Sequence, residues 1–146
     1  MAIKKSRQIA AKPSKVWAAL ADFPGIVAWA PNVDHSTAAT PAQAGIGAVR
    51  RVQAGRITLL ETIVDWQPEH LLAYTLDGLP PIAGSIVTTW ELEEHGDGTR
   101  TTITTAIHPR PNPLGRIIAR ALGRQLTKAA KQMLSGLGAY VEQEPS

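Results

Sequence analysis

The sequence predicts an α+β fold, in which a curved antiparallel sheet of about seven strands surrounds one long C-terminal helix. The helix is indicated by apolar residues that recur with helical spacing between Pro113 and Val141. The sheet is indicated by the stretch between Asn32 and His108, nearly all of which has the pattern of β-strands. A single apolar helix that faces many strands can leave a hollow between helix and sheet, and we expect any function to lie in that hollow.

The first element is expected to be a strand over residues 3–11, followed by a short helix over residues 14–21. Pro13 suits the first turn of that helix, because its missing N–H would have no partner there. An Asp-Phe-Pro-Gly segment at residues 22–25 breaks the helix. A second short helical turn is expected at residues 26–29, and it ends before a proline.

Six further strands are expected where runs of β-forming residues are bounded by turn residues. They are predicted at residues 33–40, 48–54, 57–66, 71–76, 85–94 and 99–108. The hairpins at residues 54–56 and 95–98 contain glycines, which can take the positive φ of tight turns. Strands joined by such short connections pair antiparallel.

The loop at residues 77–84 is longer than the other hairpin connections, and it carries Leu79 and Ile82 between stiff prolines. Apolar residues on a loop suggest a lid over a cavity mouth. The alternative is a loop that packs onto its neighbour, and the sequence leaves both interpretations open.

The C-terminal helix is expected at residues 113–141, with two opposed faces. Its apolar side holds Ile118, Leu122, Leu126, Ala129, Met133, Leu137 and Tyr140. Its other side holds Arg116, Arg120, Arg124, Lys128 and Lys131. We interpret these cations as the solvated face of a packed helix. Contact with a membrane surface is possible but not indicated, and nucleic-acid binding is not expected, because no aromatic residues interleave with the cations.

The chain has 146 residues, 44% of them hydrophobic and a net charge of +3, which suits one soluble domain over residues 1–146. No apolar run approaches the roughly 18–20 residues that a membrane-spanning helix needs. The basic N-terminus lacks the apolar segment of a secretory signal. The absence of cysteine excludes disulfides and thiolate chemistry and permits a reducing compartment, so the cytoplasm is the expected location.

Residues 13–23 and 29–31 resemble the opening of the polyketide cyclase/dehydrase and lipid-transport family, in the START-like (SRPBCC) superfamily. Later segments fit the same family at residues 45–50, 68–74, 89–92 and 98–101. The resemblance covers essentially the whole chain and implies a helix-grip fold with two short helices after the first strand. It does not imply one chemistry, because the superfamily contains carriers, receptors and cyclases.

A more distant resemblance to plant abscisic acid receptors lies in residues 49–52 and 60–63. Those receptors close their pocket with a Ser-Gly-Leu-Pro-Ala gate loop, which is missing here, because the corresponding hairpin is Ala-Gly-Arg at residues 54–56. The phosphatase-binding role of the receptors is therefore not carried over. The resemblance implies that Glu61 lies where the receptors place a cavity carboxylate.

If Glu61 points inward, alternation along its strand places Leu59, Ile63 and Asp65 on the same face. A charge inside an apolar cavity must be paired, hydrated or neutral, so a basic partner is expected. Arg50 and its neighbour Arg51 face opposite sides of a strand, and our interpretation favours Arg50 as the inward residue. The alternative is a surface Glu61 that pairs with an arginine across the sheet.

Among the four histidines, His35 is the one expected to look inward, and either His35 or Glu61 could serve as a general base. No histidine spacing typical of a metal site occurs, so we expect neither a metal nor a cofactor. The other predicted ligand contacts are apolar or aromatic: Leu59, Ile63, Tyr74, Leu79, Ile86, Trp90 and Met133. For the tryptophan rings, Trp90 included, our interpretation favours a role in the core over a place on the wall.

These observations predict binding or transport of a small hydrophobic ligand, such as a lipid, a polyketide or an isoprenoid-like compound, in an internal cavity. The alternative is a polyketide aromatase/cyclase or dehydratase that uses the same cavity. No recognisable catalytic motif decides whether the chain is an enzyme. The partner is expected to be the small ligand itself, with the chain a monomer or homodimer.

Overall fold

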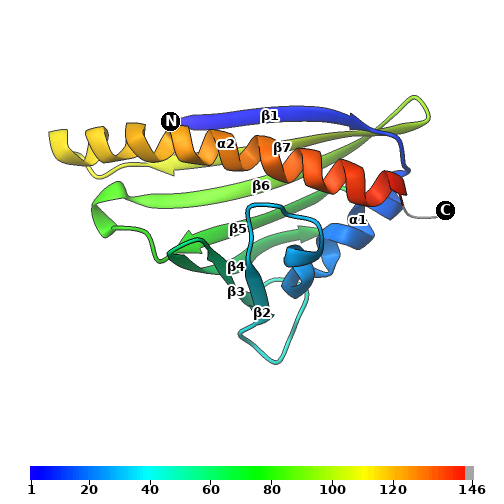
Figure 1. The fold of residues 1–146 in the computed structure, drawn as a ribbon, viewed down its shortest axis with the longest axis horizontal. Coiled ribbons are helices and arrows are strands. Elements are labelled where there is room, and N and C mark those ends of the chain that lie inside the picture. The colour runs from blue at the N-terminus through cyan, green and yellow to red at the C-terminus, as the bar shows by residue number, and fades with distance from the viewer. Residues whose placement is uncertain (144–146) are drawn as a thin grey trace.

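A computed structural model describes residues 1–143, apart from the side chain of Ile82. The strands are β1 (Ala2–Ile9), β2 (His35–Ala38), β3 (Val49–Ala54), β4 (Ile57–Gln67), β5 (Leu71–Asp77), β6 (Ser85–His95) and β7 (Gly98–His108). The helices are α1 (Pro13–Ala21), the 3-10 helices η1 (Phe23–Ala28) and η2 (Pro81–Ala83), and α2 (Pro113–Gln143). Figure 1 shows α2 lying along the length of the sheet.

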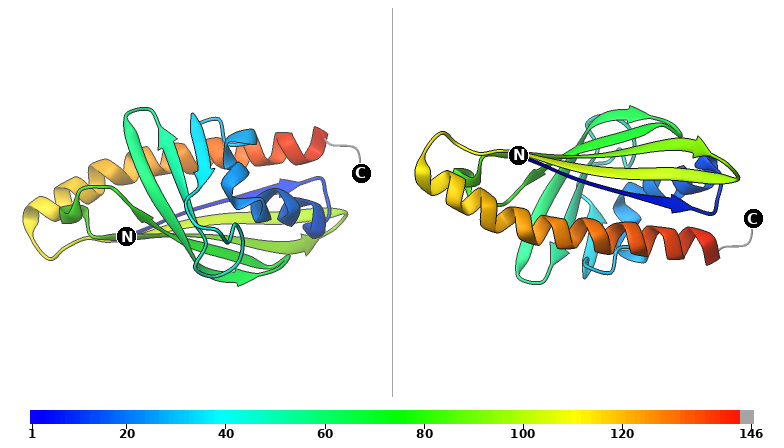
Figure 2. Two further views of the ribbon diagram at one scale, coloured as in Figure 1. Left: turned by 90° about the horizontal axis from the view of Figure 1, so that it is seen from below. Right: turned by 90° about the horizontal axis from the view of Figure 1, so that it is seen from above.

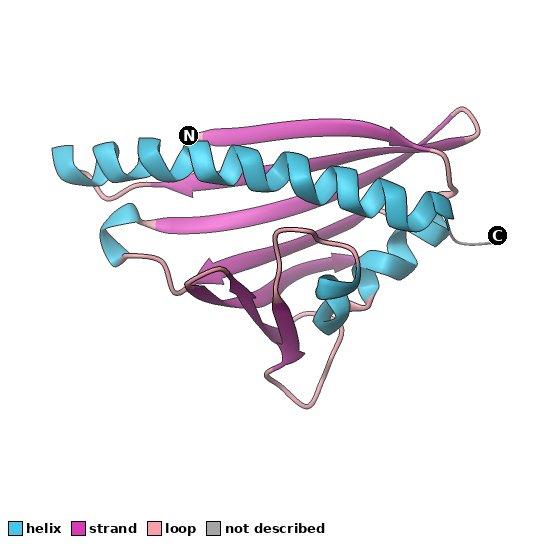
Figure 3. Ribbon diagram, viewed as in Figure 1, coloured by secondary structure: helices cyan, strands magenta, loops and turns pink. Residues whose placement is uncertain are grey.

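All seven strands form one antiparallel sheet in the order β1-β7-β6-β5-β4-β3-β2. The chain passes from one edge of the sheet to the other through α1 and η1, because β1 and β2 are the two edge strands. Figure 3 shows these helices and α2 against the curved strands, and Figure 2 shows the same arrangement from two further sides. The predicted helix-grip fold is therefore confirmed.

Strand β4 contains a bulge that changes which side chains face the core. Its register with β5 shifts between Ile63 and Asp65, so Val64 stays outside and is 46% exposed. After the bulge Trp66 turns inward, and its ring meets the ring of Trp17 edge to face at 5.0 Å between centroids. The expectation that Asp65 shares the face of Glu61 is wrong, because the extra residue reverses the alternation.

Helix α2 buries a stripe that lies beside the predicted one and is rich in small residues. The buried positions are Gly115, Ala119, Gly123, Ala130, Leu134, Leu137, Gly138 and Val141. A Cβ atom at Gly123 would lie 2.7 Å from the end of the Met1 side chain, and one at Gly138 would lie 2.6 Å from the Arg7 guanidinium. Small residues thus let α2 lie close to β1, while the five cations on its other side are exposed.

The predicted apolar stripe of α2 is mostly half-buried. Leu122, Leu126, Ala129 and Met133 are only partly covered, whereas Leu137 is fully buried. They are partly covered because they face a cavity between α2 and the sheet. Within residues 1–143, no helix combines the length and hydropathy required to cross a membrane.

Candidate functional site

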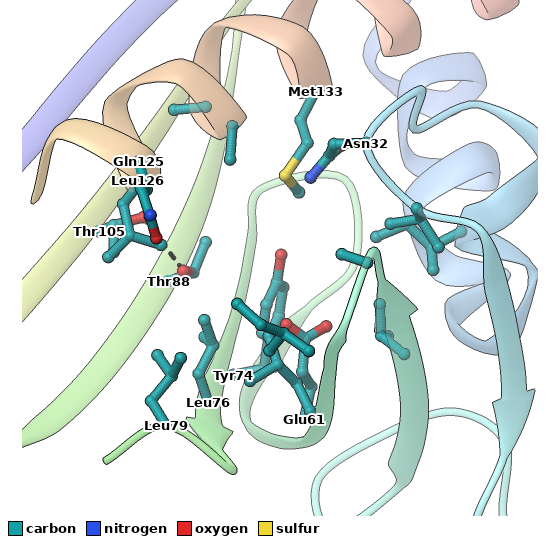
Figure 4. Close-up of a pocket in the computed structure, with 18 of the residues that line it drawn as sticks. Asn32, Glu61, Tyr74, Leu76, Leu79, Thr88, Thr105, Gln125, Leu126 and Met133 are labelled. Carbon is teal, nitrogen blue, oxygen red and sulfur yellow. Dashed lines mark hydrogen bonds between the residues drawn. The ribbon is translucent and has the colours of Figure 1, made fainter. Parts of the chain in front are cut away.

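A cavity of about 210 Å³ lies between α2 and the inner face of the sheet. Its walls come from β3 to β7, from α2, from the segment around η1 and from the loop between β5 and β6. Most of the wall is apolar, and its apolar residues include Leu59, Leu76, Leu79, Leu122, Leu126 and Met133. Figure 4 shows side chains from the strands converging on the space below Met133.

The cavity wall includes a carboxylate held by a buried ion pair. Arg50 and Glu61 lie directly opposite each other on β3 and β4, and Arg50 Nε donates to Glu61 Oε1 at 2.7 Å. Arg50 is 2% exposed and Glu61 is 6% exposed. Breaking such a pair by removing one partner typically costs about 3–5 kcal/mol, because the other charge is left buried and unpaired.

The Arg50 guanidinium is also fixed by contacts with Phe23 and Tyr74. Its Nη1 donates to the backbone carbonyl of Phe23 at 2.9 Å. It also lies over the rings of Phe23 and Tyr74, at 3.8 Å and 4.6 Å from their centroids. These contacts hold Arg50 behind Glu61, so the carboxylate and not the guanidinium faces the cavity.

Tyr74 places a phenol on the wall beside Glu61. Its oxygen accepts a hydrogen bond from Trp90 Nε1 at 3.1 Å, and its ring packs edge to face on Phe23. Burial, together with the negative charge of Glu61, raises the pKa of Tyr74 from 10.0 to about 12. The phenol therefore keeps its hydrogen at neutral pH.

Other polar groups line the cavity away from Glu61. Thr88 and Thr105 are opposite residues on β6 and β7, and their hydroxyl oxygens lie 3.1 Å apart. Gln125 is an exposed residue of α2. Asn32 Oδ1 is buried, and no described residue donates a hydrogen bond to it. An unpaired buried acceptor costs about 1–3 kcal/mol, so Asn32 is a point where a bound molecule can add a favourable contact.

Five of the predicted ligand contacts lie on the cavity wall: Leu59, Glu61, Tyr74, Leu79 and Met133. Arg50 faces inward as favoured, but it lies behind Glu61 rather than on the wall.

The loop at residues 77–84 has features of both interpretations, a lid over the cavity and a loop packed on its neighbour. The loop packs against α2 through η2, and Arg110 Nε donates to Pro81 O at 3.0 Å, while Leu79 itself reaches the cavity. The side chain of Ile82, the other predicted lid residue, lies outside the described part of the chain.

Ile63, Ile86 and Trp90 do not lie on the cavity wall, so the wall prediction is wrong for Ile63 and Ile86, while Trp90 takes the core position that was favoured for it. All three point to the inner side of the sheet, but each is at most 2% exposed and packs in the core. Trp90 is covered by Trp29, whose ring meets it edge to face at 5.8 Å. Their facing follows from strand alternation, whereas their depth depends on which helices cover them.

The expectation that His35 looks inward is also wrong. His35 pairs with Gln53 at the edge of the sheet and is exposed. Its neighbour Ser36 faces inward instead and donates to Pro24 O at 2.7 Å. Side chains alternate along a strand, so a Ser36 that faces inward forces His35 outward.

The sequence patterns did not single out Asn32, Thr88, Thr105 or Gln125 as site residues. Thr88 shares a face with Ile86 and Trp90, so strand alternation could have found it. Asn32 and Gln125 carry no comparable signal. Among the described residues, no group of three metal-ligating side chains comes together.

Known proteins share both the sequence pattern and the fold of this chain. The family model described as "Polyketide cyclase / dehydrase and lipid transport" matches residues 1–142. A search among curated proteins gave no match. The fold is similar to that of the Zhui aromatase/cyclase from Streptomyces sp. R1128, with a TM-score of 0.82, 18% identity, and 98% and 94% of the two chains covered.

Two further solved structures have the same fold. The protein TTHA0849 from Thermus thermophilus has a TM-score of 0.77 and 20% identity, with 97% of each chain covered. Ara h 8.0201 has a TM-score of 0.73 and 16% identity, with 99% of each chain covered. At these identities the likeness concerns the fold alone.

Proposed function

Because the chain belongs to the polyketide cyclase/dehydrase and lipid-transport family, whose model it matches over nearly its full length, we propose that it binds a small, largely apolar ligand in the cavity under α2. The observation that carries this proposal is an apolar cavity whose wall holds one buried, ion-paired carboxylate. Small-molecule sites are typically apolar, with a few polar groups that orient the ligand.

The volume of the cavity limits the size of the ligand. An engineered cavity of about 150 Å³ takes up benzene, and pockets for drug-sized ligands are typically about 300–1,000 Å³. At about 210 Å³ the present cavity suits one or two fused rings. A long lipid chain or a folded poly-β-keto chain would require the helix and the β5–β6 loop to move apart.

Burial of the ligand would supply most of the affinity. At about 25 cal/mol per Å², a ligand that buries roughly 200 Å² of apolar surface gains about 5 kcal/mol before the cost of association. Such a ligand is bound weakly unless its polar end is also satisfied, and this requirement makes Glu61 and Tyr74 important for selectivity.

The proposal is tested by filling the cavity from α2. Ala129 lies on the wall, and Ala121 lies on the exposed side of the same helix. We expect Ala129→Leu to weaken binding of 2-methylnaphthalene, followed by its fluorescence, at least about tenfold, because the added carbons occupy the ligand's space. Ala121→Leu should leave binding unchanged. Equal binding by both variants would place the ligand elsewhere and contradict the proposal.

A second candidate function is that of an aromatase/cyclase or dehydratase, favoured by the description of the family and by the fold of the Zhui aromatase/cyclase. Among the described wall residues, Glu61 and Tyr74 are the titratable ones. Glu61 forms an ion pair with Arg50. The Tyr74 phenol has a pKa of about 12, so it exchanges its proton poorly near neutral pH. Turnover of a small poly-β-keto compound that is lost in Tyr74→Phe would favour this candidate over simple binding.

A further inference from the structure

One oxygen of the Glu61 carboxylate accepts no hydrogen bond from a described residue. Oε1 accepts from Arg50, and no described residue donates a hydrogen bond to Oε2. Figure 4 shows the carboxylate directed from β4 into the cavity. A charged acceptor that is almost fully buried and lacks a second donor is a strong binding point for a ligand hydrogen.

The hydroxyl hydrogen of Tyr74 has no acceptor among the described residues. Its oxygen already accepts from Trp90 Nε1, and no described residue accepts the hydrogen of the hydroxyl. Tyr74 is 1% exposed, and Figure 4 shows its hydroxyl pointing into the same space as the Glu61 carboxylate. The wall therefore offers one acceptor and one donor side by side.

We propose that the cavity selects ligands whose polar end is a neutral hydroxyl group and rejects ligands that end in a carboxylate. This inference rests on the proposed function, since it concerns the same cavity. A hydroxyl group can donate to Glu61 Oε2 and accept from the Tyr74 hydroxyl. A ketone can only accept, so it leaves Glu61 Oε2 without a partner.

A carboxylate is rejected for two reasons. It has no hydrogen to give to Glu61, and it brings a second negative charge next to the first in a poorly hydrated space. Arg50 does not reverse this preference, because its guanidinium is held by Glu61 and Phe23 and stacked against the rings of Phe23 and Tyr74. A ligand acid would have to break these contacts to reach it.

The test compares three probes of nearly equal shape near neutral pH: 2-naphthol, 2-methylnaphthalene and 2-naphthoate. Their affinities for the wild-type chain are measured by calorimetry. We expect 2-naphthol to bind at least about fivefold more tightly than 2-methylnaphthalene, because a hydrogen bond to a charged group is among the stronger kinds. We expect 2-naphthoate to bind at least about fivefold more weakly than 2-methylnaphthalene.

Two variants test which groups are responsible. Glu61→Gln removes the negative charge, and it should raise the affinity for 2-naphthoate at least about fivefold relative to 2-methylnaphthalene. Glu91→Gln, at an exposed position on β6, is the matched control and should change none of the affinities. If Glu61→Gln does not fold, Tyr74→Phe is used in its place. This variant should weaken the binding of 2-naphthol but not the binding of 2-methylnaphthalene.

The outcomes separate this inference from the proposed function. If 2-naphthol and 2-methylnaphthalene bind equally, or if 2-naphthoate binds most tightly, the selectivity is overturned while ligand binding stands. If Glu61→Gln folds and keeps the wild-type order of affinities, Glu61 is not the cause and the inference is overturned. Binding of none of the three probes would overturn the proposed function, and this inference with it.

Discussion

Tyr74 connects the cavity to the core. Its hydroxyl points into the cavity, while its ring packs on Phe23 and on the Arg50 guanidinium. Burial, assisted by the charge of Glu61, raises the pKa of Tyr74 and so favours the neutral phenol over the phenolate. The same interactions that keep the hydrogen in place for a ligand therefore make the folded chain sensitive to alkaline pH.

We predict a loss of stability as the pH rises from about 10 to about 12. In this window the unfolded chain releases the Tyr74 proton while the folded chain retains it, so the equilibrium shifts toward unfolding. Two pKa units correspond to about 3 kcal/mol in total. Urea unfolding at several pH values measures the free energy of unfolding. Between about pH 10 and 12 this free energy should fall less steeply for Tyr74→Phe than for wild type, whatever the difference between the two at neutral pH. Parallel curves would show that Tyr74 does not titrate in this way.

For single residues, the sequence predicted which side of the sheet a side chain faces better than how deeply that side chain is buried. Glu61 on β4 faces inward as the resemblance implied, and Arg50 on β3 faces inward as its shared face with Val52 favoured. His35 was misplaced, because β2 is a His-Ser-Thr-Ala strand whose pattern does not fix its phase. The unpaired side-chain oxygen of Asn32 could not be predicted, because its position depends on how the segment after η1 packs near α2.

Helix α2 acts as the roof of the cavity, and glycines set its distance from the rest of the chain. A Cβ atom at Gly136 would lie 2.1 Å from the backbone carbonyl oxygen of Trp29, which has little freedom to move. At Gly123 the nearest atom is the end of the flexible Met1 side chain. The helix thus touches the η1 end of the fold through backbone and the β1 end through a side chain that can adjust.

We predict opposite effects for the same substitution at these two glycines. Alanine favours a helix over glycine by about 0.8–1 kcal/mol, so Gly123→Ala should leave the free energy of unfolding unchanged or raise it. Gly136→Ala should lower that free energy by about 1–3 kcal/mol, because the added carbon overlaps a backbone oxygen. Chemical denaturation of both variants checks the prediction. Equal stabilisation by both would mean that α2 sits farther from Trp29 than the structure places it.

The element scale also explains why the predicted face of α2 was displaced. The sequence places large apolar residues on one side and small ones beside them, and large residues were taken as the buried set. In the structure Ala119, Ala130 and Gly138 are buried against the sheet, while Leu122 and Leu126 border the cavity. Close packing of backbones favours small side chains, so the largest ones lie beside the contact, where space remains.

For the whole molecule, the succession of strands along the chain and the long helix followed from residue patterns, and the resemblance to the family implied the helix-grip fold that the structure has. The dimensions of the hollow could not be predicted in the same way. They depend on the bulge after Ile63 and on the close contact at Gly136. Neither feature has a local sequence signal, whereas the apolar Leu79 on its loop did indicate a place at the cavity.

The final prediction concerns the size limit that this geometry imposes. Phenol, 2-naphthol and 2-hydroxyanthracene carry the same polar end on one, two and three rings. A ligand present at about 100 times its Kd stabilises the folded chain by about 2.7 kcal/mol, which corresponds to a rise in Tm on the order of 5–10 °C. At one fixed concentration, we expect the rise in Tm to increase from phenol to 2-naphthol and to fall for 2-hydroxyanthracene, because a third ring exceeds the space of about 210 Å³.

Ala129→Leu provides the control for this series, because it narrows the same cavity from α2. In that variant the largest rise in Tm should move from 2-naphthol to phenol, whereas Ala121→Leu should keep the wild-type order. A three-ring ligand that stabilises the wild type most would show that α2 and the β5–β6 loop separate in solution. Larger polyketides and lipids would then be within reach of the same site, and the selectivity for a hydroxyl end would apply to them as well.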